Sequence, residues 1–193
     1  MTQGGPAIAG RTCLVTGATS GIGKAIATGL ARLGADLVVV ARDPAKGRAT
    51  VAEIQVATGN LRVGLLLADL ASQASIRRAA EEFKHTHDRL HVLVNNAGGY
   101  WATRHTTVDG LELTFALNHL AYFLLTNLLL DVLRARAPAR IVNVTSSAQA
   151  LGNIHFDDLQ FERRYRGQPP TTSPSSPTCC SPTSSPAGWR AAR

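Results

Sequence analysis

The sequence predicts an α/β protein with a doubly wound parallel sheet. Short apolar runs rich in β-branched residues alternate with longer stretches of helical periodicity up to about residue 144. The short runs are almost continuously apolar, which suits strands that helices cover on both faces, as in parallel sheets. Right-handed crossovers between such strands favour the strand order 3-2-1-4-5.

Five strands and four helices are expected. The apolar runs predict strands at residues 12–15, 37–40, 62–67, 91–94 and 140–144. The periodic stretches between them predict helices at residues 23–33, 44–57, 72–85 and 111–136. No repeat and no linker interrupts the chain before residue 160, so we expect one domain over residues 1–167. The Pro/Ser/Thr-rich residues 168–193 are expected to form a disordered tail.

Composition excludes several classes of protein. The 193 residues are 45% hydrophobic with a mean hydropathy near zero, which suits one globular core and neither a fibre nor a disordered chain. The net charge is +7, of which +4 lies in residues 161–193. The other basic residues are scattered through helical stretches and form no stripe with interleaved aromatics, so no nucleic-acid partner is expected.

The three cysteines predict a reducing, cytoplasmic setting. Two of them, Cys179 and Cys180, are adjacent, so they suit neither a disulfide framework nor a spaced zinc site. His85 and His87 lack further ligands at metal spacing, and no metal site is expected. Residues 1–10 show no signal-peptide pattern. The most apolar helical stretch, 120–130, is too short to cross a bilayer, which predicts no integral membrane segment and leaves peripheral membrane contact open.

A glycine-rich turn follows the first predicted strand and opens the first helix, with the sequence Thr16-Gly17-Ala18-Thr19-Ser20-Gly21-Ile22-Gly23. Gly17 would permit the tight turn, Gly21 would let a pyrophosphate approach the backbone, and Gly23 would allow close helix packing. The turn therefore predicts a Rossmann-type dinucleotide site. A tight turn that holds no ligand is the alternative.

Three further motifs fall at or near the carboxyl edge of the predicted sheet, where open α/β sheets bind ligands. They are Asn95-Asn96-Ala97-Gly98 after the fourth strand, Asn118 in the long helix, and Asn143-Val144-Thr145-Ser146-Ser147 after the fifth strand. With the glycine turn, this set resembles the short-chain dehydrogenase/reductase family over residues 10 to about 167. Residues 114–126 and 154–160 are similar to its retinol-dehydrogenase-like branch.

The resemblance implies roles for individual residues. The implied cofactor-binding residues are Thr16, Gly17, Thr19, Ser20, Gly21, Ile22, Gly23, Arg42, Asp69, Leu70, Asn95, Ala97 and Gly98. Among them, Asp69 and Leu70 would contact adenine, and Asn95 would close the adenosine side. Ser147 would polarise the substrate oxygen, and Asn118 would hold a water linked to the catalytic Lys. The alternatives are a polar strand end for Ser147 and a buried amide satisfied by backbone for Asn118.

The charge after the second strand indicates the cofactor. Arg42, with Lys46 nearby, would pair with a ribose 2′-phosphate, whereas an acidic residue would bind a free 2′-hydroxyl. NADP(H) is therefore favoured, although Asp43 keeps NAD(H) open. The resemblance implies an alcohol/carbonyl oxidoreductase with a lipophilic alcohol, aldehyde or ketone as substrate. A homo-oligomer is left open.

The family's catalytic pair, a Tyr with a Lys four residues on, is absent from this sequence. The lysines are Lys24, Lys46 and Lys84, and Tyr165 has Pro169 four residues later. Loss of general acid–base catalysis alone costs about 10²–10⁴-fold in rate, so we expect no useful turnover. A non-catalytic nucleotide-binding remnant and an unstable, non-functional product are the alternatives. We expect Tyr165 to be a packing or surface residue.

The tail indicates a frameshift near Gln168 to Pro170. Codons exist by which residues 169–182, read in a shifted frame, encode Ala-Tyr-His-Gln-Ser-Lys-Leu-Ala-Asn-Val-Leu-Phe-Thr, which looks like the family's Tyr-x-x-Ser-Lys segment. On this interpretation the sheet is incomplete on its C-terminal side, and the fifth strand is an unprotected edge. The apolar face of residues 111–133 would lose neighbours, and oligomers would be weakened.

Overall fold

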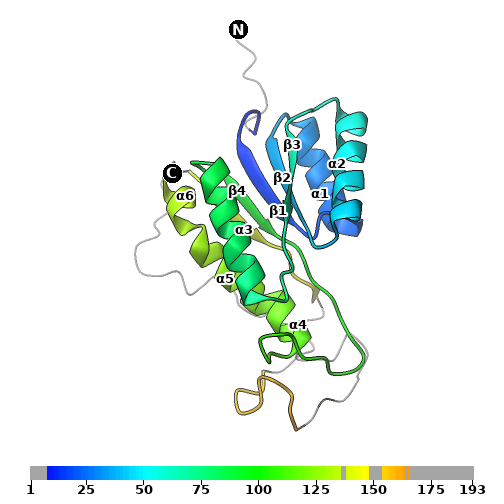
Figure 1. Ribbon diagram of the computed structural model, residues 1–193, viewed down its shortest axis with the longest axis vertical. Coiled ribbons are helices and arrows are strands. Elements are labelled where there is room, and N and C mark those ends of the chain that lie inside the picture. Colours follow the sequence, from blue (N-terminus) through cyan, green and yellow to red (C-terminus); the bar gives the residue numbers. More distant parts are fainter. Residues whose placement is uncertain (1–7, 136–137, 148–153, 164, 166–193) are drawn as a thin grey trace.

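The computed structural model describes residues 8–135, 138–147, 154–163 and 165 (Figure 1). The expected tail at residues 168–193 lies outside the described residues. A five-stranded sheet with the order β3-β2-β1-β4-β5 forms the centre of the molecule, and every neighbouring pair is parallel. The predicted fold class and strand order are thereby confirmed.

All five expected strands form within a residue or two of their predicted bounds. They are β1 (Thr12–Thr16), β2 (Asp36–Ala41), β3 (Val63–Leu67), β4 (Val92–Asn95) and β5 (Arg140–Asn143). In the central pairings Leu14 lies opposite Val38 of β2 and Leu93 of β4. All of β1 is buried, as expected for a strand with neighbours on both edges and helices over both faces.

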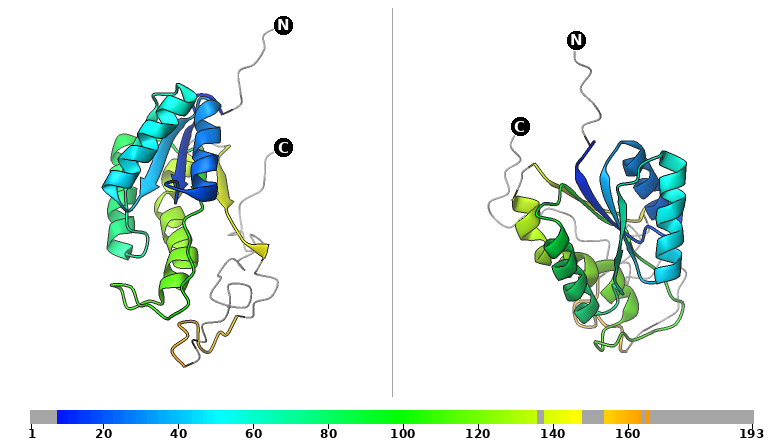
Figure 2. Two further views of the ribbon diagram at one scale, coloured as in Figure 1. Left: turned by 90° about the vertical axis from the view of Figure 1, so that its right-hand side faces the viewer. Right: turned by 45° about the horizontal axis from the view of Figure 1, so that its top comes forward.

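Helices cover both faces of the sheet (Figures 1 and 2). They are α1 (Gly21–Arg32), α2 (Pro44–Thr58), α3 (Gln73–Thr86), α4 (Leu113–Phe115), the π-helical segment η1 (Ala116–Leu120), α5 (Ala121–Leu128) and α6 (Leu130–Arg134). Alternate residues of β1 face the two cores: Val15 packs with Ala27 and Ile54 beneath α1 and α2, whereas Leu14 packs with the residues of α3, α5 and α6. Both faces of each central strand are thus apolar.

The prediction of a single helix at residues 111–136 is wrong. The Glu112 carboxylate accepts hydrogen bonds from the N–H groups of Thr114 and Phe115, so the helix begins at Leu113, two residues later than expected. It widens to a π-helix at Ala116–Leu120 and is interrupted again at Leu129, whose φ and ψ of −103° and 7° are not helical. Apolar periodicity runs through all these pieces and conceals the breaks between them.

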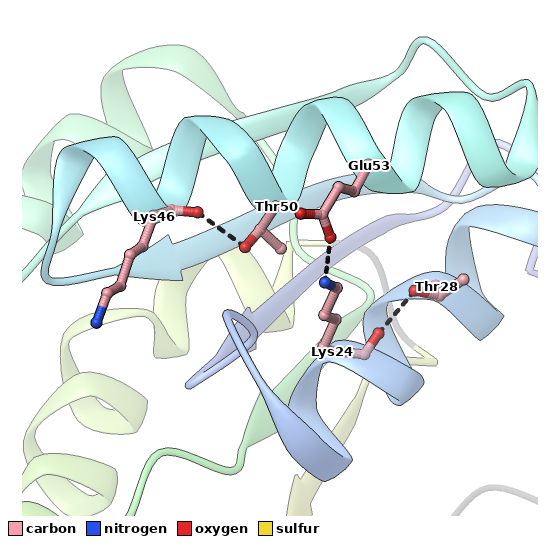
Figure 3. Close-up of polar contacts among 5 residues, drawn as sticks. All are labelled: Lys24, Thr28, Lys46, Thr50 and Glu53. Carbon is pink, nitrogen blue, oxygen red and sulfur yellow. Dashed lines mark hydrogen bonds and ion pairs between the residues drawn. The ribbon is translucent and has the colours of Figure 1, made fainter.

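Helices α1 and α2 lie side by side, joined by an ion pair between Lys24 and Glu53 (Figure 3). The hydroxyls of Thr28 and Thr50 each donate 2.8 Å hydrogen bonds to carbonyls one turn earlier in their own helices. The Lys46 side chain extends away from the Lys24–Glu53 pair. Lys24, in the first turn of α1, is therefore engaged with α2.

Among the described residues, β5 is the outer strand on the side of β4. Arg140, Val142 and Asn143 are exposed, Val142 to 43%. Phe123 of α5 is 64% exposed. The edge position expected for the fifth strand is confirmed within this part of the chain.

Candidate functional site

A cavity of about 600 Å³ opens at the carboxyl edge of the sheet. Its walls are the turns that follow β1, β2, β3 and β4, closed by the start of the α4 region. The lining residues are Gly17, Thr19, Ser20, Gly21, Ile22, Gly23, Val40, Ala41, Arg42, Ala68, Asp69, Leu70, Ala71, Asn96, Ala97, Gly98, Trp101, Leu113 and Leu117. Most of the residues singled out in the sequence thus share one cavity.

Each glycine of the turn has its own geometric requirement. Gly17 has a φ of 64°, and a Cβ built on it would lie 2.7 Å from the Ala97 Cα. A Cβ on Gly23 would lie 2.3 Å from the Gly17 carbonyl oxygen. Gly21 has a φ of 51°, a left-handed conformation that favours glycine. No atom lies within 4 Å of its Cβ position, so the space beside its backbone is open.

The N-terminus of α1 opens into the cavity at this turn. Ser20 is the N-cap, yet its side chain makes no capping hydrogen bond, and the first turn contains no acidic residue. Unpaired backbone N–H groups and the positive end of the helix dipole would favour an anion there. Ile22, 66% exposed, lies at the same place.

Thr16 does not line the cavity. It is 1% exposed, and its hydroxyl donates to the Val94 carbonyl and accepts hydrogen bonds from the N–H groups of Asn96 and Ala97 at 2.9 and 3.0 Å. Asn96 returns the contact, donating from Nδ2 to the carbonyls of Thr16 and Gly17 at 3.0 and 3.2 Å. Thr16 therefore joins the loop after β4 to the glycine turn. The sequence reasoning missed the role of Asn96, for which the paired asparagines were the available signal.

Asn95 also lies beneath the cavity and not in its wall. It is fully buried, and its Nδ2 donates to the Thr126 hydroxyl at 3.1 Å and to the Asn143 side-chain oxygen at 2.9 Å. The Asn95 amide thus connects β4 with α5 and β5. Contact between Asn95 and the adenosine of a ligand is not supported by this position.

The β2 end of the cavity carries a positive charge. Arg42 is exposed and lines the cavity, whereas Asp43 does not. The Asp43 carboxylate caps α2, accepting from the N–H groups of Ala45 and Lys46 at 2.8 and 3.0 Å. The hydrogen bond from Lys46, helped by that from Ala45, holds the pKa of Asp43 below its ordinary value. Asp43 is therefore ionised at neutral pH, and its carboxylate accepts the hydrogen bonds that cap α2.

Asp69 and Leu70 line the cavity next to β3, and Ala97 and Gly98 line it next to β4. The Asp69 carboxylate accepts a hydrogen bond from the Ala71 N–H at 3.0 Å, and the Asp69 N–H donates to the Ser75 hydroxyl at 2.9 Å. These contacts hold the loop between β3 and α3 in one conformation.

Asn118 lies in the π-helical segment and holds Gly99 from both sides. Its Oδ1 accepts from the Gly99 N–H and its Nδ2 donates to the Gly99 carbonyl, both at 2.9 Å. The Asn118 side chain is therefore bonded to backbone, as in the alternative, and its role in holding a water stays a prediction. Ser147 is exposed after β5 and is not among the residues that line the cavity; residues 148–153 beyond it lie outside the described part.

Tyr165 is a packing residue, as expected. Its hydroxyl donates to the Trp101 carbonyl at 2.6 Å, and its ring meets that of Phe161 edge to face. Burial, reinforced by the Glu112 carboxylate, raises the pKa of Tyr165. A phenol that exchanges protons needs the opposite shift.

Lys24 and Lys84 are engaged elsewhere. Lys24 pairs with Glu53, and Lys84 pairs with Glu81 at 2.8 Å. The described residues accordingly contain no Tyr–Lys pair at the cavity.

The sequence reasoning missed three side chains that line the cavity, Trp101, Leu113 and Leu117. Trp101 stands in an irregular loop without periodicity. Leu113 and Leu117 belong to a stretch whose apolar periodicity does not distinguish a residue of the core from one of the cavity wall.

Residues 8–135, 138–147, 154–163 and 165 contain no cluster of His, Cys, Asp or Glu that could hold a metal ion. Cys13 is a buried free thiol, and burial raises its pKa to about 12. The His87 ring stacks on Phe83 at the end of α3. None of the helices in the same described ranges is long and apolar enough to cross a membrane.

Residues 11–157 match the sequence model of the short chain dehydrogenase family. Among curated proteins, the chain is 45% identical to mouse (Mus musculus) retinol dehydrogenase 12 over 158 residues, covering 82% of this chain and 50% of that protein. It is 46% identical to human (Homo sapiens) retinol dehydrogenase 13 over 157 residues, covering 81% and 47%. The chain therefore spans about half the length of the curated relatives it matches.

Solved structures match the fold. An uncharacterised protein from Mycobacterium paratuberculosis has a TM-score of 0.75 and 37% identity, covering 90% of this chain and 59% of that one. An NADP active-site complex of RhlG from Pseudomonas aeruginosa has a TM-score of 0.65 and 37% identity, covering 75% and 57%. A metagenomic short-chain oxidoreductase in complex with NADP has a TM-score of 0.64 and 35% identity, covering 72% and 63%.

Proposed function

Because the chain belongs to the short chain dehydrogenase family, in its retinol-dehydrogenase-like branch, we propose that residues 1–167 are the nucleotide-binding part of an NADP(H)-dependent alcohol/carbonyl oxidoreductase. A lipophilic alcohol, aldehyde or ketone is the proposed substrate class, which the names of the retinol dehydrogenase relatives support. A cytoplasmic location, expected from the cysteines, belongs to the same proposal.

The observation that carries the choice of NADP(H) is the separation of Arg42 from Asp43. Arg42 lines the cavity, while Asp43 is outside it and caps α2. A guanidinium pairs well with a ribose 2′-phosphate, and the carboxylate that would bind a 2′-hydroxyl is otherwise engaged. Two similar solved structures hold NADP. When bound, the cofactor would supply or accept the hydride, and the α1 N-terminus, Gly21 and Arg42 would hold its phosphates.

Parallel titrations with NADPH and NADH, followed by nucleotide fluorescence, test this proposal. We expect tighter binding of NADPH, and we expect Arg42→Ala to remove most of that preference while changing NADH binding little. Lys24→Ala is the matched control, since Lys24 is a nearby cation that pairs with Glu53. Equal affinity for both cofactors in the unaltered chain would contradict the proposal.

We propose further that these 193 residues have no useful turnover. None of the three tyrosines is followed by Lys four residues later. Tyr165, nearest to the expected position, has a raised pKa and donates its hydroxyl hydrogen to the Trp101 carbonyl. Addition of a panel of aldehydes and ketones to the NADPH complex is the assay, and measurable oxidation of NADPH would overturn this proposal.

The second candidate is a non-catalytic nucleotide-binding protein. The cavity favours it, since the described residues that line it come from four strand ends and the α4 region and do not include Ser147. Binding of NADPH without turnover would support this candidate. Insolubility of the purified chain would instead favour an unstable product, for which the exposed β5 edge and Phe123 provide the reason.

A frameshift near Gln168 to Pro170 is our proposed origin for the absent pair. The restored Tyr would be encoded across Pro170 and Thr171, and the restored Lys across Pro174 and Ser175. Resequencing of the locus is the direct test. Codons for residues 169–182 that cannot encode Tyr-x-x-x-Lys when shifted would rule the proposal out.

A further inference from the structure

Trp101 forms the wall of the cavity next to β4. Its indole is partly buried and lies against Gly99, where an added Cβ would be 2.5 Å from Cη2 and 2.9 Å from Cζ3 of the ring. Leu113 and Leu117 line the cavity with it. This part of the cavity is therefore aromatic and aliphatic, unlike the glycine turn and Arg42.

The backbone around Trp101 is held in place. Both polar groups of Gly99 pair with the Asn118 side chain at 2.9 Å, and the Trp101 carbonyl accepts the Tyr165 hydroxyl at 2.6 Å. An indole that rests on a fixed peptide loses little conformational freedom when a ligand binds, so its contacts contribute more to affinity.

The strand order assigns a part of the ligand to this wall. Along the carboxyl edge, Asp69 follows β3, Arg42 follows β2, the glycine turn follows β1, and Trp101 follows β4. A dinucleotide with its 2′-phosphate at Arg42 and its pyrophosphate at the glycine turn continues toward β4. We propose that Trp101 is a binding residue for the nicotinamide half of the dinucleotide, an inference that rests on the proposed function.

Calorimetric titration of the whole 193-residue chain with two ligands tests this role. NADPH contains both halves, whereas adenosine 2′,5′-bisphosphate contains only the half that Arg42 would bind. We expect Trp101→Ala to weaken NADPH binding by about two- to tenfold, the range of an aromatic contact, and to leave the bisphosphate unchanged. Trp101→Phe should retain most of the affinity, and Arg42→Ala should weaken both ligands.

Phe123→Ala is the matched control, because Phe123 is an exposed aromatic side chain of α5 that does not line the cavity. We expect it to leave both affinities unchanged. Equal NADPH affinity in the Trp101→Ala variant and the unaltered chain would overturn the inference and leave the proposed function standing. Equal weakening of both ligands would also overturn it, because Trp101 would then act through the fold. Failure of the unaltered chain to bind either ligand would overturn the proposed function and this inference together.

Discussion

Two glycines of α1 should respond to alanine in opposite directions. A Cβ on Gly23 would lie 2.3 Å from both the Gly17 carbonyl oxygen and the Asn96 Nδ2. A Cβ on Gly29, six residues further along the same helix, would meet nothing within 4 Å. The comparison separates the packing of the glycine turn from the helix propensity of alanine.

The magnitude for Gly23→Ala follows from what the methyl group meets. Gly17 O is a backbone atom, and Asn96 Nδ2 is held by hydrogen bonds to two carbonyls, so neither can withdraw freely. Overpacking costs about 1–3 kcal/mol, and each displaced hydrogen bond costs about 0.5–1.5 kcal/mol. Both hydrogen bonds of Asn96 Nδ2 are affected, so we expect a loss of about 2–6 kcal/mol. This is a large part of the roughly 5–15 kcal/mol by which domains are stable.

Gly29→Ala should instead stabilise the protein by about 0.5–1 kcal/mol, because alanine lowers the entropy of the unfolded chain without a clash. Urea unfolding followed by far-UV circular dichroism measures both changes. A Gly23→Ala midpoint at or above that of the unaltered chain would refute the packing argument. A lower midpoint for Gly29→Ala would refute the propensity argument.

Three other predictions concern groups outside the cavity wall. The pKa of Asp43 is lower in the folded state than in the unfolded chain. The stabilisation from its cap is therefore complete above the unfolded pKa near 3.8 and is lost as the pH falls below that value. In Asp43→Ala, the melting temperature should fall less steeply with pH in this acidic range. Glu53→Gln should change the free energy of unfolding by no more than about 1 kcal/mol, less in high salt, because its ion pair with Lys24 is partly exposed. Cys13 should react with a thiol reagent at pH 8 only after unfolding, because burial raises its pKa to about 12; rapid labelling of the folded chain would contradict this.

Local patterns were sufficient for the elements of the sheet and for the glycine turn. Continuous apolar runs predicted all five strands, because a strand buried on two faces needs apolar residues at every position. Helical periodicity failed for residues 111–136, because the apolar pattern continues through the π-helical segment and through the interruption at Leu129. A helix break without Pro or Gly leaves no mark in that pattern.

The sequence by itself determined the fold class and the strand order, through the alternation of apolar runs with helical stretches and the right-handed crossover rule. It also located Gly17, Gly21 and Gly23, whose turn is formed by neighbours along the chain. Only the tertiary structure decided which side chains face the cavity. Thr16 and Asn95 belong to the same motifs as their neighbours, yet both are buried beneath it, and Trp101 enters its wall from an irregular loop. The direction of a side chain at a strand end depends on partners about 80 residues away, such as Asn96 for Thr16, and on the packing of the loops between them.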